Sequence, residues 1–98
     1  FVFAALKELV DTAPEKRVVD QIENCAYRVN GVLDVHDLRT RTSGGKVFAE
    51  IHIMVNGDMT VREGHAVAKA VERCLFDEVP RLDQAIVHVD PTDLEEQA

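Results

Sequence analysis

The order of apolar and polar residues along the chain predicts two amphipathic helices in its first third. Residues 1–12 have the spacing of a short helix, and residues 14–29 have that of a longer one. The glycine of Asn30-Gly31 suits the left-handed conformation in which many helices end. One stripe of the longer helix is expected to be buried, namely Val18, Val19, Ile22, Cys25, Ala26 and Val29.

Three later segments are predicted to be β-strands. Residues 33–42 and 46–55 flank the turn sequence Ser43-Gly44-Gly45 and therefore indicate a hairpin, while residues 84–90 form a last strand. In the second and third of these strands the side chains alternate, with the odd-numbered apolar residues on one face. Alternation in the first strand is mixed, so the pattern leaves open which way His36 faces.

A second long helix is expected between the last two strands. Thr60 and Glu63 have the spacing of a capping box, and the helix that they start should extend to about Phe76. The resulting order is α-β-β-α-β, an α+β arrangement in which two helices bury their stripes on one face of a three-stranded sheet. The other face of the sheet is then open to solvent or to another subunit.

Composition limits the possible partners. The chain has 98 residues, which suits one domain, and a net charge of −7, with a sequence pI near 4.9. Such an acidic domain repels nucleic acid and anionic lipid, so neither is expected as a partner, and no apolar run is long enough to insert into a bilayer. The start at Phe1 lacks a signal peptide, and we expect an excised fragment of a longer protein. No nucleophile–base pair or phosphate loop is present, which argues against an enzyme.

The two cysteines lie far apart in the sequence. Cys25 and Cys74 form no C-x-x-C pair, and each falls on the apolar side of a predicted helix. We expect both to be buried free thiols in a reducing compartment.

The chain has four histidines, and three of them fall in predicted strands. His52, His88 and Asp90 share the face that the helices leave open, because positions i and i+2 of a strand point to the same side. Imidazole and carboxylate together form a ligand set for a borderline divalent metal such as Zn²⁺. Spacing alone leaves open that the histidines are ordinary surface or core residues. Glu50, two residues before His52, is a candidate for the carboxylate that hydrogen-bonds to this imidazole and orients it. Three apolar residues of the open face indicate a partner surface, namely Phe48, Met54 and Ile86.

At these residues the chain resembles the cytoplasmic C-terminal domain of cation diffusion facilitator transporters. The matching blocks are residues 35–44, Ile51-His52-Ile53, Glu63-Gly64-His65 and Val87-His88-Val89-Asp90-Pro91, and residues 9–14 look like the linker after the last membrane helix. The resemblance implies a ferredoxin-like, metallochaperone-like two-layer sandwich and a homodimer that forms a V below the membrane. It also implies a metal-ligand set, with the aspartate able to bridge two ions near the dimer interface: His36, His52, His65, His88 and Asp90.

The function expected from this resemblance is that of a metal sensor on the cytoplasmic side of a membrane. Residues 1–13 would link residues 14–91, the metal-sensing dimerisation domain, to the exporter's own transmembrane domain, and residues 92–98 would be a disordered acidic tail. Zinc is the first candidate ion, with iron and manganese as alternatives. Two other functions stay open: a free-standing soluble metal carrier, and a ferredoxin-like dimerisation or organic-ligand domain without a metal role.

Overall fold

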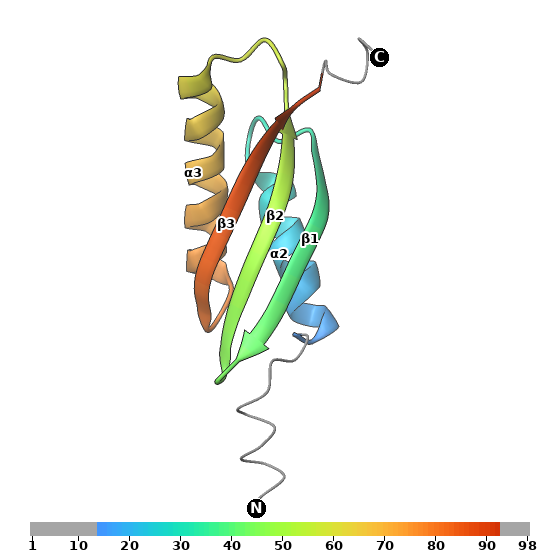
Figure 1. Cartoon of the computed structure of the whole chain (residues 1–98), viewed down its shortest axis with the longest axis vertical. Helices are drawn as coiled ribbons and strands as arrows, with labels where there is room; N and C mark the ends of the chain where they lie inside the picture. The colour runs from blue at the N-terminus through green and yellow to red at the C-terminus, as the bar shows by residue number, and fades with distance from the viewer. Residues whose placement is uncertain (1–13, 93–98) are drawn as a thin grey trace, which may run out of the picture.

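The computed structural model describes residues 14–92, which form two helices and three strands (Figure 1). The short helix expected over residues 1–12 and residues 93–98 of the acidic tail lie outside the described residues, whereas the amide of Thr92 donates to the Val55 carbonyl at 3.1 Å. In chain order the elements are α2 (Lys16–Arg28), β1 (Asp34–Ser43), β2 (Lys46–Val55), α3 (Val61–Glu78) and β3 (Leu82–Pro91). No helix among the described residues is both long and apolar enough to cross a bilayer.

The three strands form one mixed sheet in the order β1-β2-β3. β1 pairs with β2 antiparallel, as a hairpin requires, and β3 returns beside β2 in parallel after the crossover through α3. In the view of Figure 1, α2 lies behind the sheet and α3 runs alongside β3, and both helices pack against the same face of the sheet, whose other face is uncovered. The predicted αββαβ two-layer architecture is therefore confirmed.

The core lies between the helices and the covered face of the sheet. Along β2 the residues alternate between buried odd-numbered and partly exposed even-numbered positions, as the sequence pattern predicted. The largest fully buried side chains come from both layers, namely Ile22, Cys25, Val47, Ile51, Ile53, Val71 and Leu75. Because β2 is the central strand, it is paired with a neighbour on each edge, and these two registers fix the direction of its side chains.

Capping residues set where α3 begins. The Thr60 amide donates to Glu63 Oε1 at 2.9 Å, and the Glu63 amide donates to Thr60 Oγ1 at 3.1 Å. The predicted capping box is thus present, and such a cap contributes about 1 kcal/mol. After α2, Gly31 has the predicted left-handed conformation, with a φ of 101°, but the helix ends earlier, with Val29 as an extended C-cap.

A β-bulge in β1 explains the mixed alternation of that strand. His36 lies opposite His52 and Arg39 lies opposite Glu50, so β1 has two residues where β2 has one. Asp37, within the bulge, has a φ of 49°. Because of the extra residue, His36 and Arg39 both pair with residues of the open face, which a strict two-residue period forbids.

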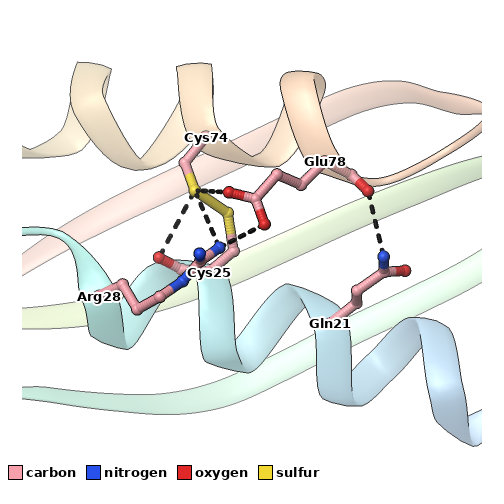
Figure 2. Close-up of a disulfide and its surroundings, with 5 residues drawn as sticks. All are labelled: Gln21, Cys25, Arg28, Cys74 and Glu78. Atoms are coloured by element: carbon pink, nitrogen blue, oxygen red, sulfur yellow. Dashed lines mark hydrogen bonds and ion pairs between the residues drawn. A yellow bond between two sulfur atoms is a disulfide. The ribbon is translucent and has the colours of Figure 1, made fainter.

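The expectation of free thiols is wrong. Cys25 of α2 and Cys74 of α3 form a disulfide between the two helices (Figure 2). Their Cα atoms are 6.1 Å apart, within the range that a disulfide spans. The two cysteines are separated by 49 positions in the sequence, and they meet because the stripes of α2 and α3 pack beside each other. Spacing along the chain contains no such information.

Candidate metal centre

The uncovered face of the sheet contains a row of three histidines. His36 of β1, His52 of β2 and His88 of β3 occupy directly paired positions, so the sheet register places them side by side. Their rings stack, with centroids 5.4 Å apart between His36 and His52 and 4.4 Å apart between His52 and His88. Cross-strand neighbours on one face of a sheet are close in space wherever they lie in the sequence. The structure thus assigns His36 a facing that the sequence left open.

Asp90 joins the first two rings of this row. One carboxylate oxygen, Asp90 Oδ2, lies 3.2 Å from His36 Nε2 and 3.0 Å from His52 Nδ1. Ligand atoms around a tetrahedral zinc ion with bonds near 2.0 Å are about 3.3 Å apart, close to both distances from Asp90 Oδ2. All three side chains are partly exposed, which leaves room for a further ligand from water or another chain.

A second group of ligands overlaps the first. His88 Nε2 lies 2.6 Å from Glu50 Oε2, and these two residues together with His52 offer three ligand atoms within 4.8 Å of one another. Glu50 was expected behind His52 but contacts His88 instead. A neutral imidazole has a single lone pair, so His52 can serve only one of the two groups at a time. The described face therefore has two overlapping ligand triads that share one ring.

Asp37 was missed as a neighbour of the site. Its Oδ2 lies 3.6 Å from His52 Nε2, and its Oδ1 lies 3.4 Å from Arg39 Nε. Because Asp37 sits in the bulge, a regular strand pattern assigns it to the wrong face. The mixed alternation around it was the only signal in the sequence.

His65 lies apart from the histidine row. It is exposed on the first turns of α3 and lines a groove of about 370 Å³ between α3, the loop after β2 and the end of β3. The groove is mostly apolar, with Met59 and Val89 among its lining residues. His65 belongs to neither of the two ligand triads of the open face. Its role as a ligand stays a prediction.

The open face also contains apolar and aromatic side chains. The guanidinium carbon of Arg41 lies 4.2 Å from the centre of the Phe48 ring, and Ile86 beside them is 42% exposed. These residues line a shallow hollow next to Glu50. Phe48 is thus partly covered by its own chain, whereas Ile86 remains available to a partner.

Comparisons with known proteins identify relatives over almost the whole chain. The family model described as "Cation efflux protein, cytoplasmic domain" matches residues 14–92. The cation-efflux pump FieF of Yersinia enterocolitica is 34% identical over 90 residues, which are 92% of this chain and 30% of that protein. Metal tolerance protein C1 of Arabidopsis thaliana is 30% identical over 91 residues, 93% of this chain and 19% of that one. The chain thus spans less than a third of either relative.

Solved structures agree with this match. A nickel form of a variant MamM C-terminal domain has a TM-score of 0.77 at 28% identity, covering 80% of this chain and 99% of the other. A cadmium form of another variant has a TM-score of 0.76 at 30% identity, covering 79% and 96%. The ferredoxin-like fold is therefore shared with these domains.

Proposed function

The chain belongs to the cation efflux family, whose cytoplasmic domain it matches, and from this premise we propose that it is the dimeric, metal-responsive regulatory domain of a divalent-cation exporter. The observation that carries the proposal is the convergence of two imidazoles on one carboxylate oxygen of the uncovered sheet face, at His36, His52 and Asp90. Two imidazole nitrogens and a carboxylate oxygen this close together are a ligand set that a borderline divalent cation accepts.

Charge explains how a metal could change the assembly. The chain has 18 acidic and 11 basic residues, so two copies that approach through ligand-bearing faces repel each other. A bound divalent cation reduces this repulsion and favours a closed arrangement of the two domains. The equilibrium shifts only by the difference between the metal affinities of the closed and open states. Residues 1–13 would pass that bias to the transmembrane domain.

His65 enters this proposal through the dimer. Within one chain it lies outside both ligand triads, so it can join a metal only if a second chain or a movement of α3 brings it to the row. Its position beside an apolar groove suits contact with a partner subunit. In this arrangement the metal would lie close to the dimer interface, so closing of the two domains would change the affinity of the site for the metal.

Ligand chemistry favours zinc. Two imidazoles and one carboxylate suit zinc better than manganese, which prefers sites richer in oxygen ligands, and iron(II) lies between them. The similar MamM domains include a nickel form and a cadmium form, so related domains accept several divalent ions. Zinc is the proposed ligand, with iron and manganese as the competitors to be tested.

Calorimetric titration of Zn²⁺, Fe²⁺ and Mn²⁺ tests this function, with small-angle scattering on each sample. With the disulfide kept oxidised, wild type should release heat and become more compact with Zn²⁺, whereas His52→Ala/Asp90→Ala should do neither. Asp77→Asn serves as the control, since it removes one exposed carboxylate of α3 away from the row. Equal heats and unchanged dimensions in wild type and the double variant would exclude a sensor role for this face.

A further inference from the structure

The helix layer contains a second group of metal-ligating side chains, on the opposite side of the sheet from the histidine row. Cys74 and Glu78 are one turn apart on α3, and Cys25 reaches them from α2 (Figure 2). The two sulfur atoms and one Glu78 carboxylate oxygen all lie within 4.8 Å of one another. The group is therefore assembled by helix packing and is independent of the sheet register.

The guanidinium of Arg28 lies beside this group of ligands. Arg28 Nη2 lies 3.7 Å from Cys74 Sγ and forms an ion pair with Glu78, whose Oε2 is 3.3 Å from the same sulfur. A cysteine binds metal as the thiolate, and the Arg28–Glu78 pair places one positive and one negative charge beside Cys74. Cys25 has no exposed surface, whereas Cys74 is partly exposed, so a reductant can approach from the Cys74 side.

We propose that Cys25, Cys74 and Glu78 form a thiophilic metal site that becomes available when the disulfide is reduced. Two molecules of a thiol reductant supply two electrons and two protons, which cleave the S–S bond, and leave as their own disulfide. The two protein thiols then release two protons as they bind one divalent ion, while Glu78 exchanges its ion pair with Arg28 for the metal. In the oxidised state the sulfurs share a bond and provide no thiolate.

The ligand set determines which ion fits. Two thiolates and one carboxylate are softer than the two imidazoles and one carboxylate of the open face, so they favour zinc and cadmium over manganese. Zn–S bonds of about 2.3 Å place two thiolates roughly 3.8 Å apart, which cleavage of the S–S bond permits. Either a covalent bond or a metal ion then joins α2 to α3. This site does not depend on the sensor function proposed for the histidine row.

Absorption spectroscopy of the full chain with Cd²⁺ or Co²⁺ tests the site, because thiolate ligands give an intense ultraviolet charge-transfer band and imidazole or carboxylate ligands do not. The protein is reduced anaerobically with a phosphine, which brings no competing thiol. The band should form with one ion per chain in reduced wild type and be absent from oxidised wild type. Glu78→Gln should keep the band and weaken Cd²⁺ binding roughly tenfold.

Variants separate the two metal sites. Cys74→Ser should lose the band, with Cys74→Ala as a second variant if the first folds poorly by circular dichroism. His52→Ala/Asp90→Ala should keep the band in full, so failure of the sensor function and failure of this site are distinguishable. The proposal is overturned if reduced wild type gives no band at saturating Cd²⁺, or if the band persists in both Cys74 variants. Two free thiols in the unfolded, air-oxidised protein would overturn the redox control.

Discussion

The two layers of this small domain hold their reactive groups together by different means. On the open face, sheet register aligns His36, His52 and His88 without any covalent link. In the helix layer, packing brings Cys25 to Cys74 and a disulfide joins them. The first arrangement leaves its imidazoles and carboxylates partly exposed, whereas the second uses its sulfurs to stabilise the fold. The same αββαβ architecture thus separates the proposed metal-binding face from the layer that the disulfide stabilises.

Reduction of the disulfide should have the largest effect on stability. The loop that it closes has about 50 residues, for which the chain-entropy model gives about 4 kcal/mol. Urea denaturation of oxidised and reduced wild type, in the presence of a chelator, measures the difference. The Cys25→Ala/Cys74→Ala variant should resemble the reduced protein. If reduction leaves the midpoint unchanged, the bond does not hold the helix layer.

Loss of the shared carboxylate should have the next largest effect, on metal affinity and not on folding. Asp90→Asn removes the one oxygen that both His36 and His52 approach, and we expect Zn²⁺ affinity to fall about 100-fold or more. Calorimetry measures the affinity, with Asp77→Asn as the control. An unchanged affinity would show that the metal binds elsewhere.

Glu50→Gln should have a smaller effect on the same face. It replaces the carboxylate that contacts His88 by a neutral amide of similar size, so Zn²⁺ affinity should fall about tenfold. The comparison with Asp90→Asn ranks the two overlapping triads. A larger loss for Glu50→Gln than for Asp90→Asn would place the ion between Glu50 and His88.

The smallest effect is expected for the ion pair that crosses the helix layer. Arg28 and Glu78 are both well exposed, so Arg28→Gln should cost less than about 1 kcal/mol in the oxidised protein. Urea denaturation at two salt concentrations measures this, since added salt should remove the difference. A cost near that of losing the disulfide would mean that the pair, and not the covalent bond, joins the helices.

Periodicity and capping residues predicted most of the fold. The alternation in β2 and β3 predicts one shared face for His52, His88 and Asp90, and the strand pairing confirms that they share it. Regular alternation makes this prediction possible, because the direction of each side chain in a strand follows from that of the residue before it. The bulge at Asp37 and the meeting of Cys25 with Cys74 could not be predicted in this way. Both depend on contacts between segments distant in sequence.

The extra residue in β1 inverts the alternation of side chains along the strand. Before it the even-numbered side chains of β1 face the open side, as His36 does, and after it the odd-numbered ones do, as Arg39 does. Deleting Asp37 would restore regular alternation along β1. Leu38, which packs against the core, would then be the one inward residue between His36 and Arg39. The histidine row can therefore survive a change of strand length at this point, at the loss of the carboxylate beside His52. Deleting Val35 has no such compensation: the hairpin would keep His36 opposite His52, but Asp34 would take the inward position at which Val35 is buried.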